Sequence, residues 1–448
     1  MAVEISNLPL PPSLPGKPLV GNLFDFQADS ERLIRSGYDK FGPIFSIQLG
    51  PQKVAVLLEA ENQQFFFKRT DTVLRMDRAY QFLAAMFGKV FFTADPETYQ
   101  RQKPLILPPF RGENMPNYLD IFQEEINIWF NTLDEEGSFD LISVFDQLAK
   151  YIAAHALMGK DFRQRISDEF FGLYRDLSNG LDMILPPNLP LPKFIRRDSA
   201  KKKMAQILSP IIVERRANPG EKKDFLQHFA EAKYKDGTPL DDSTIIGLIN
   251  GLIFAGHETT AGQGSWALIE LLRHPDYLSS VQNEIDQLFP TSELITKITQ
   301  QNLNDLNHLD WAIKETERLH SSAGTPMRYN HEAYELGGYH IPQGWLTMVH
   351  TGVGHRLSKY FQEPEKYDPL RFAPDRAEDK QHPFVMFGFG GGVHKCLGMN
   401  FANNEMAVFI TMLLHAYDLE LMTSNPRLRP GAGVAKPEAT FIHYKKKK

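Results

Sequence analysis

The sequence has only one cysteine, Cys396, among its 448 residues. A lone cysteine excludes an intramolecular disulfide and any metal site built from several thiolates. A metal ion that is bound through sulfur must therefore be bound by this residue.

Positive charge is not in excess. The chain has 49 Lys and Arg against 55 Asp and Glu, a formal net charge of −6. Because nucleic-acid binding usually requires clustered positive charge that displaces counterions, we predict that no nucleic acid is a partner. Gly and Pro, at 31 and 30 residues, are too few for a low-complexity chain, and a hydrophobic fraction of 42% is typical of a globular protein.

The sequence also lacks a hydrophobic run long enough to cross a membrane. The longest apolar stretch, residues 245–254, is interrupted by Asn250 and is far shorter than the roughly 18 residues that a spanning helix needs. Residues 1–7 are too few for a signal peptide or an anchor. We expect a cytoplasmic protein if this N-terminus is native, and a membrane-associated protein if an anchor was removed.

The chain shows no internal repeat and no linker between halves of different composition. A length prior of roughly 150 residues per domain suggests about three domains but also allows one large unit. Clustered prolines favour an extended conformation near the N-terminus. We predict a proline-rich segment at residues 1–20, a single domain at residues 21–444 and a lysine tail at residues 445–448.

Helical periodicity dominates the pattern of apolar residues. It covers most of residues 115–287, with breaks at Gly137, residues 186–192 and residues 219–220. The fold class that we expect is mainly α, with a large helical domain and a small β-rich lobe.

Strands are predicted at few places. The runs at residues 45–49 and 53–57 flank a Gly-Pro turn and predict a hairpin near the N-terminus. Residues 339–342 and 345–349 predict a second short pair.

One predicted helix is unusually long. Asp242 and Ser243 can cap a helix that continues to Arg273 and is stopped by Pro275, about 32 residues or roughly 48 Å. Its apolar composition suits a buried central helix, yet residues 256–260 are largely polar. Because buried polar groups need partners, these residues should face a cavity, water or a ligand.

The residues around Cys396 carry the strongest chemical signal. Residues 389–398 are rich in glycine, which allows a tight loop, and an amphipathic helix is predicted at residues 399–417. A cysteine ahead of a helix start has a lowered pKa, and the thiolate is the form that binds iron. A structural cysteine on a glycine-rich turn is the alternative.

The spacing of this loop resembles the haem-binding signature of the cytochrome P-450 superfamily. The matching residues are Phe389, Gly390, Gly392, His394, Cys396 and Gly398. The resemblance implies the cytochrome P-450 fold, with the long central helix over haem b. It also implies that Cys396 is the thiolate ligand of the iron, that His394 donates to a haem propionate, and that Phe389 and Gly390 pack at the cofactor.

Further motifs follow the order of this superfamily. Glu315 and Arg318 are three residues apart on one helix face and resemble its buried Glu-x-x-Arg pair, which Arg371 joins. Arg328 and the degenerate pair Tyr99 and Lys103 correspond to propionate-binding residues. A solvated helix face is the alternative for the last pair.

Glu258 and Thr259, in the middle of the long helix, resemble the acid and threonine that deliver protons during oxygen activation. Proton delivery requires a carboxyl and a hydroxyl that order water near the reacting oxygen. A threonine bonded to its own helix and a surface glutamate are the alternatives.

The substrate side resembles the sterol 14α-demethylase family, although that family usually has a histidine at the position of Glu258. The implied pocket residues are Tyr80, Phe82, Leu83, Phe87, Phe254, Ala255, Ala323, Thr325 and Met327. Ordinary core packing is the alternative for the aromatic residues.

The resemblance implies a haem-thiolate monooxygenase that uses O2 to hydroxylate a bulky lipophilic molecule such as a sterol, terpenoid or retinoid. Because no Gly-rich dinucleotide fingerprint is present, electrons must come from a ferredoxin with its reductase or another electron-transfer protein. Lys395, Arg101 and Lys103 could form a basic face for an acidic partner. We expect a monomer. Fatty-acid hydroxylation, peroxygenase or isomerase activity, and non-enzymatic haem or lipid binding remain alternatives.

Overall fold

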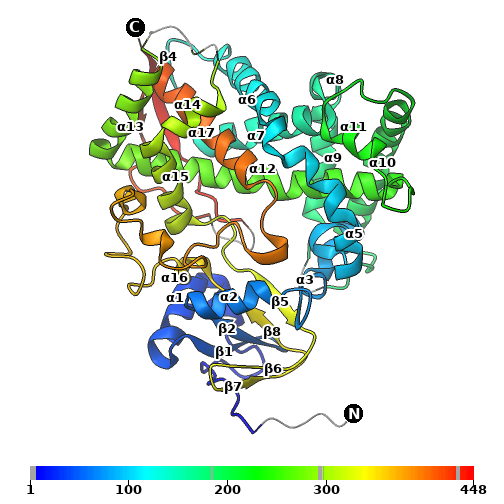
Figure 1. Cartoon of the computed structure of the whole chain (residues 1–448), viewed down its shortest axis with the longest axis vertical. Helices are drawn as coiled ribbons and strands as arrows, with labels where there is room; N and C mark the ends of the chain where they lie inside the picture. The colour runs from blue at the N-terminus through cyan, green and yellow to red at the C-terminus, as the bar shows by residue number, and fades with distance from the viewer. Residues whose placement is uncertain (1–6, 183–184, 291–294, 296, 430–433, 448) are drawn as a thin grey trace.

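The computed structural model describes residues 7–182, 185–290, 295, 297–429 and 434–447. Helices fill the upper and middle parts of the molecule, and a small sheet lobe lies at the opposite end beside the N-terminal segment (Figure 1). This arrangement confirms the predicted fold class.

Helices form most of the described structure. The α-helices are α1 (Leu23–Phe41), α2 (Ala60–Lys68), α3 (Met76–Ala79), α4 (Ala84–Phe87), α5 (Pro96–Ile106), α6 (Met115–Phe130), α7 (Leu141–Met158), α8 (Lys160–Arg165), α9 (Ser167–Asn179), α10 (Pro192–Ala217), α11 (Phe225–Glu231), α12 (Asp242–Arg273), α13 (Pro275–Leu288), α14 (Gln300–Asp305), α15 (Asn307–His320), α16 (Thr351–Gly354) and α17 (Met399–Ala416). Short 3-10 helices are η1 (Gln81–Leu83), η2 (Phe91–Thr93), η3 (Pro108–Phe110), η4 (Gly112–Asn114), η5 (Pro369–Phe372), η6 (Glu378–Lys380) and η7 (Gly392–His394).

The central helix is α12, which crosses the helical part of the molecule (Figure 1). Its N-cap is Asp241, whose side chain accepts from the amide of Thr244, so the predicted cap at Asp242 is one residue too late. Pro275 begins α13 instead of continuing α12, because proline has no amide hydrogen for the helix. The predicted long helix is otherwise confirmed.

The core surrounds α12, which packs against α7, α15 and α17. The segment that contains Phe87, before α5, also lies close to α12. A Cβ at Gly247 would lie 2.3 Å from the carbonyl oxygen of Phe87, so the glycine allows the segment with Phe87 to touch α12.

The strands are β1 (Ile44–Leu49), β2 (Gln52–Leu57), β3 (Leu74–Arg75), β4 (Glu136–Asp140), β5 (Met327–Asn330), β6 (Tyr334–Leu336), β7 (Tyr339–Ile341), β8 (Leu346–Met348), β9 (Tyr417–Leu421) and β10 (Phe441–Lys446). The predicted hairpin is confirmed, because β1 and β2 pair antiparallel from Leu49 opposite Gln52 to Ile44 opposite Leu57. Among the described strands, the largest sheet has the order β1-β2-β8-β5-β3.

The second predicted strand pair is wrong. β7 pairs with β6, whereas β8 joins the large sheet between β2 and β5. Both segments are strands, but each finds its partner elsewhere, because Tyr334 to Leu336 forms a local hairpin with β7.

A third sheet, of order β4-β10-β9, brings the end of the chain beside the start of α7. β10 continues through Lys446, so two of the four terminal lysines lie in a strand. β4 contains Gly137, where the sequence predicts a helix break. In the described part of the chain, we find no helix that is both long and apolar enough to cross a bilayer.

Candidate active site

A tight glycine-rich loop holds Cys396 in front of α17. Gly390 and Gly392 have φ angles of 69° and 64°, a conformation that other residues rarely adopt. The amide of Cys396 donates to the carbonyl of Phe389 over 2.9 Å and closes the loop. The thiol therefore lies two residues before Gly398, the N-cap of α17.

The Cys396 side chain is accessible and borders a cavity of about 340 Å³. The protein around the sulfur nevertheless desolvates it, and this raises the pKa of the Cys396 thiol; the charge of Glu317 adds to the increase, whereas the Gly398 amide and Lys395 oppose it. The expectation of a lowered pKa is therefore wrong in direction, because desolvation outweighs the helix start.

Tyr99, Lys103 and His394 come together at this loop. Lys103 Nζ and the Tyr99 hydroxyl both donate to the carbonyl of Val393, over 2.7 and 3.2 Å. The Tyr99 ring stacks on His394 with 4.2 Å between centroids, and burial raises the pKa of Tyr99 to about 12, so its hydroxyl remains a donor. Nε2 of His394 lies 2.8 Å from Oδ2 of Asp71.

Arg328, on β5, is buried with 3% of its surface exposed. Its Nε donates to Thr70 Oγ1 over 3.2 Å, and its guanidinium lies 4.9 Å from the centre of the Phe66 ring. Burial lowers the pKa of Arg328. Within the described ranges Arg328 has no ion-pair partner, and such a buried cation favours an anionic ligand nearby.

The middle of α12 is open on one side. Ala255 and Gly256 are exposed halfway along a mostly buried helix, and nothing lies within 4 Å of the place where a Gly256 Cβ would stand. Thr259 Oγ1 donates to the carbonyl of Ala255 over 2.6 Å. The threonine is thus bonded to its own helix, while its oxygen keeps the capacity to accept a further hydrogen bond.

Glu258 follows this open stretch. Its Oε2 lies 3.2 Å from Nζ of Lys436, and its side chain is 44% exposed. Neither of the two predicted proton-delivery residues is enclosed by core side chains.

Glu315, Arg318 and Arg371 form a buried charged cluster with 0% exposure of each side chain. Arg318 binds both oxygens of Glu315, over 2.7 and 2.8 Å, and Arg371 Nε donates to the same carboxylate over 3.1 Å. Nη1 of Arg371 donates to a carboxylate oxygen of Glu378 over 2.7 Å, and this second carboxylate balances the charge of Arg371. The structure therefore brings the three predicted structural residues together.

The predicted pocket aromatics form one group with Phe92. Phe87 and Phe254 lie 5.1 Å apart, and the Phe92 ring is within 6.3 Å of Tyr80, Phe87 and Phe254. Tyr80 also lies 6.2 Å from Phe82, and its hydroxyl accepts from the amide of Met327.

Exposure divides the predicted pocket residues. Leu83 and Phe87 are buried, with 3% and 2% exposed, as in ordinary core packing. The others retain accessible surface: Tyr80, Phe82, Phe254, Ala255, Ala323, Thr325 and Met327.

Sequence reasoning missed Asp71, Phe92, Glu378 and Lys436. Phe92 continues the aromatic run that includes Phe91, and that run was a usable signal. For the three charged residues the sequence offers no local signal, because each meets its partner only through the fold.

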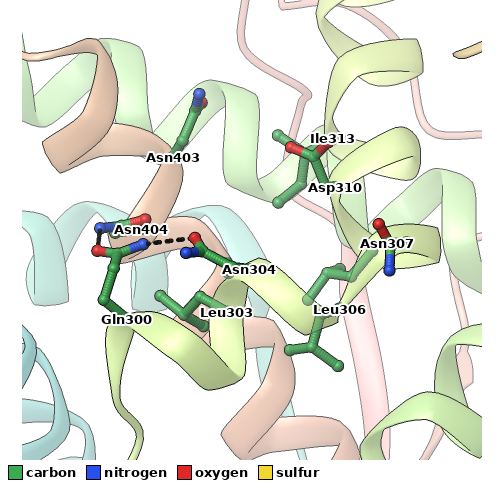
Figure 2. Close-up of a pocket in the computed structure, with 11 residues that line it drawn as sticks. Gln300, Leu303, Asn304, Leu306, Asn307, Asp310, Ile313, Asn403 and Asn404 are labelled. Carbon is green, nitrogen blue, oxygen red and sulfur yellow. Dashed lines mark hydrogen bonds between the residues drawn. The ribbon is translucent and has the colours of Figure 1, made fainter.

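Another cavity, of about 320 Å³, lies between α14, α15 and α17. Figure 2 shows its amide-rich wall, where Gln300 is hydrogen bonded to Asn404 and Asn304. It contains none of the predicted site residues, so we do not assign it to the active site.

An accessible thiol on a glycine-rich loop before a helix, together with a long helix that has an open centre, is typical of a haem-thiolate enzyme. The sequence model of the family described as Cytochrome P450 matches residues 11–443. The chain belongs to the cytochrome P450 family and is a cytochrome P450 monooxygenase. Enzymes of this family use O2 and a redox partner and act on lipophilic substrates, and this holds for the chain.

Two curated relatives are sterol demethylases, which confirms the predicted likeness. A sterol 14alpha-demethylase of Mycolicibacterium vanbaalenii is 32% identical over 408 residues, 90% of this chain and 89% of the relative. A sterol 14-demethylase of Arabidopsis thaliana is 32% identical over 449 residues, 98% of this chain and 92% of the relative. A solved cyanobacterial P450 with retinoic acid bound superposes with a TM-score of 0.88 at 24% identity, covering 99% of this chain and 100% of that chain, and supports the fold.

The residues of the candidate site fit a haem. The thiol is accessible, the buried Arg328 suits an anionic propionate, and Gly256 leaves space beside α12. Tyr99 and Lys103 bring polar groups to the loop, and Lys103 keeps ammonium hydrogens that the Val393 carbonyl does not use.

Proposed function

We propose that the enzyme hydroxylates a bulky lipophilic substrate, such as a sterol, terpenoid or retinoid-like molecule. Haem b is its cofactor, O2 its oxidant, and a ferredoxin with its reductase, or a similar electron-transfer protein, its electron source. The enzyme acts as a monomer of one domain, residues 21–444. The sterol demethylase relatives support a sterol-like substrate.

Cys396 binds the haem iron, and Phe389 and Gly390 shape the loop against the ring. Arg328, His394, Tyr99 and Lys103 hold the propionates. When bound, haem supplies the iron at which dioxygen is reduced and one oxygen atom is inserted into the substrate. The accessible Cys396 sulfur is the observation that carries this proposal, because no other described side chain offers a thiolate.

Glu258 and Thr259 deliver protons at the open middle of α12. The carboxylate reaches solvent, from which it can take up a proton, and the Thr259 oxygen can accept a hydrogen bond from water beside Gly256. The open stretch at Ala255 and Gly256 supports this role, since it leaves room for small molecules next to both side chains.

The substrate lies against the aromatic group that includes Tyr80 and Phe254. Ala323, Thr325 and Met327 continue this surface, because they follow α15 into β5 with accessible side chains and the Met327 amide donates to the Tyr80 hydroxyl. Such a largely apolar surface favours a rigid lipophilic molecule. The Tyr80 hydroxyl is the polar group best placed to orient it.

The redox partner docks over the Cys396 loop. The cavity beside the thiol is lined by Lys103, Arg111 and Lys395, which supports an acidic partner. Arg101 is exposed nearby, although it pairs with Asp236 over 3.4 Å. Reduction of the haem by ferredoxin should slow markedly with rising salt; an unchanged rate over a wide salt range would contradict this docking mode.

A spectroscopic screen tests the substrate class. Sterols, terpenoids, retinoids and long-chain fatty acids are titrated into the haem protein, and Soret shifts are recorded. We expect shifts with sterols or other rigid polycyclic lipids, followed by oxygenated product with ferredoxin, reductase and NADPH. Binding of fatty acids alone would contradict the proposal, as would product formed with peroxide but not with the reductase.

A further inference from the structure

Lys436 reaches the middle of α12 from the C-terminal part of the chain. Its Nζ lies 3.2 Å from Oε2 of Glu258, and the lysine side chain is only 14% exposed. Throughout the described ranges, no other lysine or arginine comes within ion-pair distance of Glu258. The long side chain of Lys436 therefore lies against α12 and pairs with the carboxylate of Glu258.

The segment that carries Lys436 is docked at several points. The Ala435 amide donates to the carbonyl of Ser322 over 3.3 Å, and Ser322 Oγ donates to the carbonyl of Thr259 over 3.0 Å. The carbonyl of Lys436 accepts from the amide of Arg429 over 2.8 Å. The C-terminal segment, the turn after α15 and the centre of α12 therefore form one connected unit.

Gly262 allows this close contact. A Cβ at Gly262 would lie 2.9 Å from the Ala435 carbonyl oxygen and 3.2 Å from Cγ of Lys436. A side chain at this position would push the segment away from α12, one turn after Glu258. The contact can therefore be disturbed without touching either charged residue.

The other titratable groups near Glu258 in the described ranges do not supply the positive charge that Lys436 supplies. Nε2 of His257 lies 4.0 Å from Oε1 of Glu258 and 3.7 Å from Asp146, and burial lowers the pKa of His257, which favours its neutral form. Asp146 is paired with Lys150. Tyr174 stacks edge-on against His257, and burial keeps its hydroxyl protonated by raising its pKa. Lys436 is the only full positive charge in contact with the carboxylate among these described groups.

We propose that Lys436 is a positioning residue that holds the Glu258 carboxylate at the open middle of α12, so that the C-terminal segment takes part in proton delivery. This inference rests on the proposed function, in which Glu258 and Thr259 move protons. A glutamate that is 44% exposed can rotate into solvent, and its ion pair with a docked lysine limits this motion.

Turnover tests the role of Lys436 in the haem protein with ferredoxin, reductase, NADPH and a substrate from the screen. Lys436→Met should lower the product formed per NADPH several-fold and raise peroxide release, whereas Lys436→Arg should keep most of the coupling. In a Glu258→Gln background, Lys436→Met should have no further effect. An equal further loss in that background, or unchanged coupling in Lys436→Met, would overturn the proposal.

Hydrogen exchange tests the contact without turnover. The amides of residues 434–436 and of Glu438 should exchange several-fold faster in Lys436→Met, Glu258→Gln and Gly262→Ala than in the wild type. Lys160→Met is the matched control, because it breaks an exposed ion pair with Glu124 elsewhere. Unchanged exchange in Lys436→Met and Glu258→Gln would overturn the proposal. A wild type that forms no oxygenated product would instead contradict the proposed function, and exchange would still decide the contact.

Discussion

His394 and Asp71 are far apart in sequence but form a close pair, with 2.8 Å between Nε2 of His394 and Oδ2 of Asp71. Both side chains are at most 10% exposed. Asp71 has a φ angle of 71°, in the left-handed region that aspartate tolerates better than most residues. The pair fixes the plane of the His394 ring, which also stacks on Tyr99. Nε2 of His394 is occupied by Asp71, and Nδ1 remains to bind a ligand.

Loss of the Asp71 acceptor should loosen the cofactor. Asp71→Gly keeps the backbone conformation accessible but frees the His394 ring, so we expect haem loss to apomyoglobin to accelerate several-fold. Asp71→Asn retains an acceptor oxygen and tolerates the same φ angle, so its rate should stay close to that of the wild type. Equal rates in Asp71→Gly and the wild type would show that the pair does not orient His394 toward the haem.

Thr259→Ala should leave the haem bound while diverting reducing equivalents to peroxide. The hydroxyl that can bind water beside Gly256 is lost, whereas the helix loses only hydrogen bonds from Thr259 to the carbonyls of Ala255 and Gly256. We expect coupling of NADPH to product to fall at least several-fold, because general acid-base groups typically contribute about 10²-fold or more. Thr259→Ser is the control and should retain most of the coupling. Full coupling in Thr259→Ala would remove the residue from the mechanism.

Breaking the buried charged cluster should destabilise the protein strongly. Arg318→Ala leaves Glu315 with one arginine in a site with no exposure, and truncating one partner of a buried pair costs roughly 3 to 5 kcal/mol. We expect a large drop in urea midpoint and in the yield of haem protein. Lys160→Ala, which breaks an exposed pair with Glu124, should change stability by less than about 1 kcal/mol. A normal holoprotein yield in Arg318→Ala would show that the cluster is peripheral.

Glu405, on α17, should make the protein less stable as pH rises. Burial raises the pKa of Glu405 from 4.5 to about 8, so between these values the folded state keeps a proton that the unfolded state has released. The free energy of unfolding should therefore decrease by a few kcal/mol from pH 5 to pH 8, at about 1.4 kcal/mol per pH unit.

Comparison with variants isolates this contribution. In urea unfolding, Glu405→Gln should be as stable as the wild type at pH 5 and more stable at pH 8. The exposed Glu332→Gln is the control and should match the wild type at both values. A wild type and Glu405→Gln that respond equally to pH would contradict the raised pKa.

Local signals were sufficient for much of the fold. The limits of α12 and the β1-β2 hairpin follow from residues close in sequence: a capping aspartate, Pro275 and a Gly-Pro turn. The pairing of strands that are distant in sequence does not follow from such local signals. The predicted pairing of residues 339–342 with 345–349 is wrong for this reason. β8 pairs parallel with β2, where Thr347 lies opposite Ala55, and no pattern within β8 specifies this partner.

The candidate site divides in the same way. The residues of the Cys396 loop and the Glu315 motif are close in sequence, and their spacing made them recognisable. The ion pairs of Asp71 and Lys436 join segments far apart in the chain, so only the fold brings them together. The net direction of the Cys396 pKa also depends on desolvation in the folded protein and on the charge of Glu317, which the spacing of the loop does not describe.

The pairing of β10 with β4 has a consequence for biosynthesis. The amide of Thr440 donates a hydrogen bond to the Asp140 side chain at this sheet, although 300 residues separate the two. Lys436 lies just before β10. On the ribosome, β4 must wait for about 300 further residues before it gains its neighbour. A nascent protein that has not yet reached Lys436 would have the Cys396 loop but neither this sheet nor the lysine that pairs with Glu258, so oxygen chemistry should be acquired only after this segment is made.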